Sequence, residues 1–131
     1  MTLYGVMTNT QISQTVLVVE DEAFIRMSTV ATLEDAGFSV LEAHNSADAL
    51  RVLAGHEDVR IMVTDVRMPG AMDGLGLVAR LQQERPMLQA LVVSANACAD
   101  DAFKAGAVAF LSKPFLAQSI VQAVCELAKA A

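Results

Sequence analysis

The sequence has few aromatic residues and few cysteines, and both shortages limit what the protein can be. Aromatic residues make up 5% of the 131 residues and none is tryptophan, so the core must come from the aliphatic part of a 54% hydrophobic content, as in sheets covered by helices on both faces. The two cysteines, Cys98 and Cys125, lie far apart and form no paired CxxC motif. Inert thiols are therefore favoured over a disulfide, a metal site or a redox function.

Long apolar runs and clustered positive charge are also missing. No apolar stretch approaches the ~20 residues that span a bilayer, and residues 1–14 lack the basic start and apolar core of a signal peptide. The nine basic residues are scattered and the formal net charge is -6, which does not suit a nucleic-acid surface. We expect a cytoplasmic protein with no membrane insertion and no direct contact with nucleic acid.

Two groups of catalytic motif are missing too. The chain has no GxxxxGK[ST] loop, and the Gly74-Leu75-Gly76 string lacks the third glycine of a dinucleotide-binding GxGxxG, so nucleotide binding is disfavoured. His44 and His56 have no GxSxG partner, which argues against a Ser/His/Asp hydrolase. Both histidines are expected at the surface.

Apolar runs alternate with helical patterns along the chain. The runs predict five strands, at Thr15–Glu20, Phe38–Ala43, Val59–Thr64, Leu88–Val93 and Ala107–Leu111. Ser46 and Asp73 are candidate helix N-caps, and Gly37, Gly55 and Pro86 are candidate stops. This alternation predicts an α/β fold of right-handed βαβ units, with one parallel sheet between two helical layers. The polar, aperiodic residues 1–14 predict a flexible N-terminal arm, and residues 15–131 a single domain.

Reactive polar residues stand where four of the five apolar runs end. They are Glu20 and Asp21, then Asp65, Ser94 and Lys113. Ligands of open parallel sheets bind beyond the carboxyl ends of the strands, so these side chains are expected to meet. Three crowded carboxylates repel one another, and a hard cation with oxygen ligands, such as Mg²⁺, relieves that repulsion. The alternative for each acid alone is a helix start for Glu20 and Asp21 and a loop acid for Asp65.

The order of these residues resembles the response-regulator receiver domain of two-component signal transduction. The resemblance runs from Thr15 to Ala128 and rests on TVLVVEDE, VTDVRMPG followed by MDG, VVSA and AGAVAFLSKPF, which occur in the family order. It implies a receiver domain over residues 15–131 with a flavodoxin-like (βα)5 fold, a doubly wound parallel sheet in strand order 2-1-3-4-5.

The resemblance also implies a role for each site residue. Asp65 corresponds to the phospho-accepting aspartate, and Glu20, Asp21 and Asp65, with the backbone carbonyl of Arg67, to the ligands of Mg²⁺. Lys113 and Ser94 correspond to the other catalytic side chains, Ser94 and Phe110 to the switch pair, and Lys113-Pro114 to a cis peptide bond. Alternatives stay open for three of them: Ser94 as a strand-end cap, Phe110 as a core aromatic and Lys113 as a surface charge.

The implied function is a phosphorelay switch rather than a conventional enzyme. Asp65 would take a phosphoryl group from a sensor histidine kinase or a histidine phosphotransfer protein, and the changed surface would bind a downstream protein target, with weak homodimer formation as a further expectation. We expect a single-domain response regulator; a receiver excised from a longer protein is the alternative. The rival functions are a pseudo-receiver that binds partners without phosphorylation and an aspartyl-phosphate phosphatase, which would need an aspartate where Arg67 stands.

One spacing departs from the family pattern. Eighteen residues separate Ser94 from Lys113, about three fewer than the resemblance implies, so the helix between them is expected to be nearly one turn short. Arg67 and Asn96 stand at positions that flank the phosphoryl group in the family. The output face is therefore the part that the sequence predicts least well.

Overall fold

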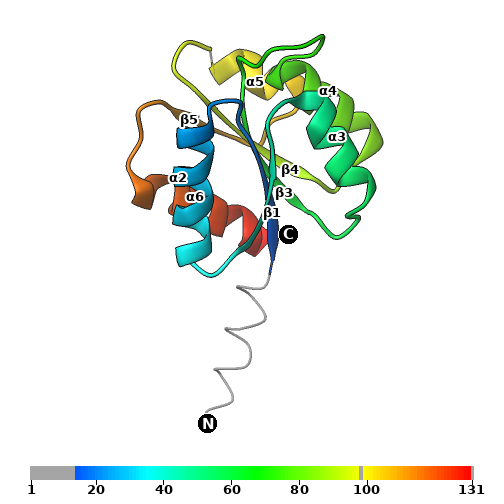
Figure 1. Ribbon diagram of the computed structural model, residues 1–131. Helices are drawn as coiled ribbons and strands as arrows, with labels where there is room; N and C mark the ends of the chain where they lie inside the picture. Colours follow the sequence, from blue (N-terminus) through cyan, green and yellow to red (C-terminus); the bar gives the residue numbers. More distant parts are fainter. Residues whose placement is uncertain (1–13, 98, 131) are drawn as a thin grey trace.

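A five-stranded parallel sheet forms the centre of the computed structural model, which describes residues 14–97 and 99–130 (Figure 1). The strands are β1 (Thr15–Val19), β2 (Ser39–Ala43), β3 (Ile61–Asp65), β4 (Gln89–Ser94) and β5 (Ala109–Ser112). The helices are α2 (Ala23–Asp35), α3 (Ser46–Ala54), α4 (Gly74–Glu84), α5 (Ala99–Ala105) and α6 (Ala117–Ala130). The strand order in the sheet, β2-β1-β3-β4-β5, confirms the predicted fold.

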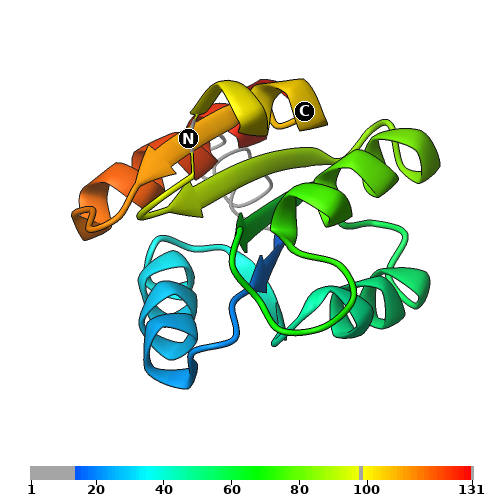
Figure 2. The same cartoon turned by 90° about the horizontal axis from the view of Figure 1, so that it is seen from above.

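Helices cover both faces of the sheet (Figures 1 and 2). Alternate side chains of β1 enter different cores: Leu17 and Val19 pack with α3, α4 and α5, whereas Val16 and Val18 pack with α2 and α6. Because both faces are buried, the central strands are apolar without alternation, which is why their sequence runs are continuous. Both cores are largely aliphatic, as the composition indicated.

The predicted strands all occur, with ends within two residues of the expected positions. The predicted arm, residues 1–14, lies outside the described residues except for Gln14. Cys98 also lies outside them. Cys125 is a free, half-buried thiol on α6, and both histidines are exposed as expected. No helix in the described part of the chain has both the length and the apolar character needed to cross a membrane.

One predicted helix cap is wrong. The N-cap of α3 is Asn45, whose side chain accepts a hydrogen bond of 2.8 Å from the backbone N–H of Asp48. Ser46 is already the first helical residue, and its buried hydroxyl donates to the backbone carbonyl of Asp73 at 3.3 Å. A contact with a residue 27 positions away engages the hydroxyl, and such a contact has no local sequence signal. The Asp73 cap is confirmed, because its carboxylate accepts from Gly76 at 2.9 Å.

The helix that was expected to be short has seven residues, against nine to fourteen in the other described helices. This helix, α5, carries one fully buried residue, Ala102. Its Phe103 is 48% exposed. Helix α5 therefore contributes little to the buried core.

Arg85, at the amino-terminal edge of the sheet, links the end of α4 to the end of α3 and to the connection before β3. It follows α4, and its guanidinium donates to the carbonyl of Leu53 at 2.9 Å, of His56 at 3.1 Å and of Val59 at 3.2 Å. These acceptors lie at the end of α3 and along the connection to β3. One side chain thus donates to a carbonyl at the end of α3 and to two carbonyls of the connection that follows it.

Replacing Arg85 by methionine is expected to lower the free energy of unfolding by about 2 kcal/mol, because partly buried carbonyls lose a charged donor. Urea denaturation measures the change. Arg80→Met is the matched control. Within residues 14–97 and 99–130 Arg80 pairs only with Glu84, in an exposed i,i+4 contact, so its loss should change stability by less than about 0.5 kcal/mol. Equal stability of the two variants would show that the Arg85 contacts contribute nothing.

Candidate functional site

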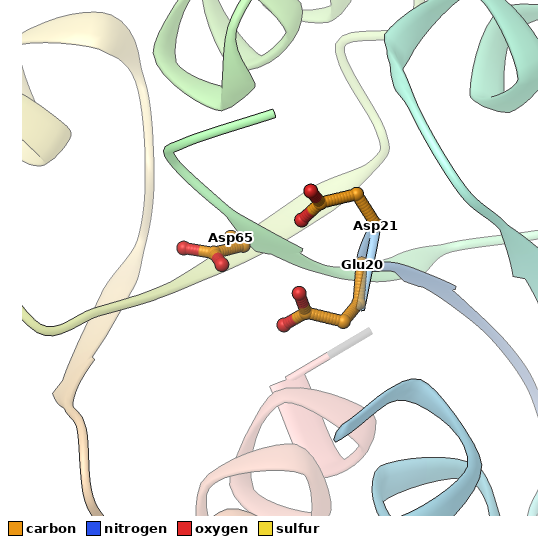
Figure 3. Close-up of side chains that lie close together, drawn as sticks. All are labelled: Glu20, Asp21 and Asp65. Atoms are coloured by element: carbon orange, nitrogen blue, oxygen red, sulfur yellow. The ribbon is translucent and has the colours of Figure 1, made fainter. Parts of the chain in front are cut away.

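Three carboxylates gather at the carboxyl ends of β1 and β3, and Figure 3 shows them turned toward the same side. Glu20 and Asp21 follow β1, and Asp65 ends β3. The parallel register pairs Val19 with Thr64, so the next residue of each strand, Glu20 and Asp65, lies at the same level of the sheet. One oxygen from each acid lies within 4.8 Å of the others. Their burial differs: Glu20 is buried, Asp65 half-buried and Asp21 exposed.

Glu20 is held by contacts to its side chain and its backbone. Its Oε1 accepts from Lys113 Nζ at 2.9 Å, and its Oε2 accepts from the backbone N–H of Glu22 at 3.2 Å. Its own N–H donates to the carbonyl of Ala43 at 3.0 Å, which continues the pairing with β2. Its carbonyl accepts from Arg26 Nη1 at 2.8 Å. Glu20 is therefore a fixed element of the site.

Lys113 lies between two of the acids. Its ammonium contacts Glu20 Oε1 and Asp65 Oδ2, both at 2.9 Å, and its side chain is 17% exposed. Burial by itself lowers the pKa of Lys113, but the hydrogen bonds and charges of Asp65 and Glu20 outweigh it, and the pKa is raised. Burial raises the pKa of Glu20, and the contact with Lys113 only partly opposes that. Lys113 is thus a cation at neutral pH, aimed at Asp65, and it is followed by the expected cis peptide bond to Pro114.

Ser94 ends β4 beside this group and is buried. Its Oγ accepts from the backbone N–H of Asn96 at 3.2 Å and of Ala97 at 2.9 Å, so the hydroxyl does cap the strand end. Both contacts use the oxygen as acceptor and leave the hydroxyl hydrogen available to donate. The Ser94 carbonyl accepts from the backbone N–H of Lys113 at 2.9 Å, which places these two residues side by side.

Phe110 lies on β5, opposite Val92 of β4, and is half-buried. It packs against the core that β1 and β3 share with α3, α4 and α5. This is the geometry of a core aromatic, and its role as a switch stays a prediction.

A cavity of about 400 Å³ opens among these groups. Its lining residues are Asp21, Glu22, Ile25, Asp65, Arg67, Ser94, Ala95, Asn96 and Lys113. Residues that carry carboxylates, a hydroxyl and an ammonium thus line one space. The exposed Arg67 and Asn96 flank the cavity. That the backbone carbonyl of Arg67 binds the metal stays a prediction.

Two residues of this site were not foreseen. Arg26 of α2 contacts the Glu20 carbonyl, and the only signal for it was an arginine in the first turn of the helix that follows the acids. Gly74, the first residue of α4, packs so closely behind β3 that a Cβ there would lie 1.8 Å from the Asp65 carbonyl oxygen. The sequence showed a glycine after a helix cap but not the strand behind it.

The site can be compared with known proteins. The response regulator receiver domain model matches residues 16–125 of the chain. The chain belongs to the response regulator receiver domain family. It is 36% identical over 103 residues to the DNA-binding transcriptional regulator NtrC of Escherichia coli K12, a match that covers 76% of this chain and 22% of NtrC. It is 38% identical over 123 residues to the sensor kinase CckA of Brucella abortus, which covers 88% of this chain and 12% of CckA.

Solved receiver structures share the fold. A receiver domain protein from Clostridium thermocellum superposes with a TM-score of 0.83 at 26% identity, covering 89% of this chain and 95% of that one. The chain spans less than a quarter of either curated relative, so their whole activities are not transferred to it. What the family membership supports is a phospho-accepting role, as receiver domains accept phosphoryl groups from sensor kinases.

The acidic cluster of this receiver domain fits the family's magnesium site. The donors are three carboxylates, and Mg²⁺ prefers oxygen ligands. Lys113 supplies one positive charge against three acids, which leaves a net negative site for a divalent cation. The exposed Asp21 and the half-buried Asp65 both line the cavity, whereas Glu20 is not among its lining residues. A metal ion could therefore bind without breaking the contacts that hold Glu20.

Proposed function

We propose that this receiver domain takes a phosphoryl group onto Asp65, with Mg²⁺ bound, from the phosphohistidine of a sensor histidine kinase or a histidine phosphotransfer protein. The phosphorylated domain then presents a changed surface to a downstream protein. One observation supports this above the others: the Asp65 carboxylate reaches a solvent-open cavity and lies 2.9 Å from the ammonium of the half-buried Lys113.

In the transfer, a carboxylate oxygen of Asp65 forms a bond to phosphorus while the bond from phosphorus to the histidine nitrogen breaks. The transition state is loose and spreads negative charge over the equatorial phosphoryl oxygens, so the protein acts by positioning and by positive charge. Lys113 is placed to supply that charge from one side. The Asp65 backbone is set by the β3 ladder and by α4 packing behind it.

Glu20, Asp21 and Asp65, with the backbone carbonyl of Arg67, would hold Mg²⁺, which when bound neutralises charge on the phosphoryl oxygens. The acids differ in what they contribute. Glu20 is buried and fixed by Lys113 and Glu22, so it supplies a preset negative charge. Asp21 is exposed and faces the cavity, so it is the more accessible ligand.

The proposed switch depends on the hydroxyl hydrogen of Ser94, which is available to donate a hydrogen bond. A phosphoryl group on Asp65 brings acceptor oxygens near Ser94, and donation to one of them would draw Oγ toward the cavity. That movement weakens the bonds that Oγ accepts from Asn96 and Ala97, in the loop before α5. Phe110 would then fill the vacated space, which changes the surface of α5 and β5.

The histidine donor must cover the mouth of the cavity to deliver its phosphoryl group. Helix α2 starts directly after the acids and carries Phe24 and Met27, which are 87% and 60% exposed. Exposed apolar side chains beside a reactive site are suited to a protein partner. We expect the donor to pack on α2.

The rival functions have less support. A phosphorylation-independent interaction module has no need for three acids and a lysine converging on a cavity. A phosphatase would need a second acid where Arg67 lines the cavity.

Beryllofluoride, an analogue of the phosphoryl group, tests the switch. Added with Mg²⁺, it should shift the backbone amide resonances of Asn96 and Ala97, because their hydrogen bonds to Ser94 Oγ are weakened. The measurement is a two-dimensional NMR spectrum of labelled protein. Ser94→Ala should still bind beryllofluoride but give smaller shifts at these two amides. An unchanged wild-type spectrum would favour the pseudo-receiver.

Saturating Mg²⁺ is expected to stabilise the fold. At ten times the dissociation constant the gain is about 1.4 kcal/mol, because the ion binds the three gathered acids and not the unfolded chain. Thermal melts with Mg²⁺ and with a chelator measure it. Asp21→Asn should lose most of the gain while staying folded, since Asp21 is exposed. Identical melting temperatures of the wild type in both buffers would exclude these acids as a magnesium site.

A further inference from the structure

Arg26 joins three parts of the receiver domain. It belongs to the first turn of α2, and its side chain is 20% exposed. Its Nη1 donates to the Glu20 carbonyl at 2.8 Å, at the end of β1. Its Nε donates to Glu42 Oε1 at 3.1 Å, on the edge strand β2. A guanidinium can satisfy both acceptors because its donors are fixed in one plane.

We infer that Arg26 is a positioning residue that holds the metal-binding acids in place, an inference that rests on the proposed function. The Glu20 carbonyl belongs to the peptide group that leads into Asp21. On its other side Glu20 is anchored by its N–H to Ala43. Arg26 and Ala43 together therefore fix the backbone from which the exposed Asp21 projects into the cavity.

Glu42 has the supporting part in this arrangement. Its carboxylate is 48% exposed, so the ion pair with Arg26 is screened by water and adds little stability on its own. The contact instead orients the Arg26 guanidinium, because Glu42 accepts from its Nε while its Nη1 donates to the Glu20 carbonyl. An uncharged acceptor at position 42 can do the same.

Position and charge predict opposite results for loss of Arg26. Arg26 is a cation near three acids, so by Coulomb's law alone its removal should make the site more negative and Mg²⁺ binding tighter. Loss of the contact to the Glu20 carbonyl instead frees the backbone before Asp21 and should weaken binding. The sign of the change in affinity therefore separates the two effects.

The test uses the variants Arg26→Met, Arg26→Lys, Glu42→Gln and, as a control for loss of a surface cation, Arg51→Met. Arg51 pairs with Asp48 on α3 and makes no contact with the acids that the structure records among its described residues. The Mg²⁺ dissociation constant is measured by NMR titration of each variant. Melting in a chelator establishes first that each variant is folded.

Arg26→Met should weaken Mg²⁺ binding about tenfold, the lower end of the effect of losing a contact that orients a metal ligand. Arg26→Lys should fall between wild type and Arg26→Met, because an ammonium can reach only one of the two acceptors well. Glu42→Gln and Arg51→Met should bind Mg²⁺ like the wild type. Labelling by acetyl phosphate should need more Mg²⁺ in Arg26→Met but reach nearly the wild-type rate at saturation.

Unchanged or tighter Mg²⁺ binding in Arg26→Met would overturn the inference, and so would an equal loss in Arg51→Met. If Arg26→Met does not fold, Arg26→Lys decides: weaker binding supports positioning by Arg26, and wild-type affinity refutes it. A wild-type protein that binds no Mg²⁺ and accepts no phosphoryl group would refute the proposed function instead. The two failures are thus distinguishable.

Discussion

Asp65→Asn should accept no phosphoryl group from acetyl phosphate under conditions that label the wild type fully. The amide is not a nucleophile for phosphorus, and the substitution also removes one of the three acids from the cluster proposed to bind Mg²⁺. The protein should stay folded. Loss of the Lys113 contact at 2.9 Å is opposed by relief of repulsion from Glu20 and Asp21. Intact-mass measurement gives the labelling, and a chelator-treated melt gives the stability.

Asp73→Asn is the matched control for this substitution. Asp73 caps α4 close to the site, and asparagine caps a helix as well as aspartate does. The control should therefore label like the wild type and melt at nearly the same temperature. Labelling of Asp65→Asn at the wild-type rate would remove Asp65 from the mechanism.

Gly74→Ala should strongly destabilise the domain. The new Cβ would lie 1.8 Å from the Asp65 carbonyl oxygen and 2.8 Å from its carbonyl carbon, and both are backbone atoms of a buried sheet. Helix α4 must move away from β3 to make room. We expect a loss of about 3 kcal/mol, because the gain of about 1 kcal/mol from alanine's helix propensity cannot offset such overpacking.

The same substitution should slow labelling about tenfold or more, since the displaced atoms belong to Asp65, the proposed phospho-acceptor. Gly55→Ala is the control, because a Cβ there meets only the Val52 carbonyl oxygen at 3.8 Å, an ordinary contact. Urea denaturation and acetyl phosphate labelling of both variants measure the two effects. Wild-type stability of Gly74→Ala would contradict the close packing of α4 against β3.

The fold could be predicted because its signals are local and repeated. Buried parallel strands need continuous apolar runs, and the connecting helices need stop residues such as Gly55 and Pro86, so alternation is visible along the chain. The strand order came from family resemblance. The cap of α3 was predicted wrongly, because Ser46 has the right chemistry but its hydroxyl contacts Asp73, which comes near only after folding.

The sequence predicted those site residues whose positions are set by the ends of strands. Glu20, Asp65 and Lys113 each follow a strand, and parallel strands bring such residues together without further information. Contacts between separate elements are a different matter. The guanidinium of Arg26 and the close approach of Gly74 depend on how α2 and α4 lie on the sheet, which no spacing along the chain encodes.

In the region from Ser94 to Lys113, the contacts in the structure do not by themselves indicate a switch. The seven-residue α5 and the strand-end contacts of Ser94 are clear in the structure. Phe110 packs as a core residue does. Whether this segment transmits the state of Asp65 depends on a second conformation, which is why beryllofluoride is the appropriate probe for it.

Mass spectrometry of the wild-type protein after incubation with Mg²⁺ and acetyl phosphate tests the central claim most directly. The proposal predicts one added phosphoryl group per chain, located at Asp65 by peptide mapping, lost on treatment with hydroxylamine and absent when a chelator replaces Mg²⁺. No mass gain with Mg²⁺, or a phosphoryl group located on any other residue, would contradict it.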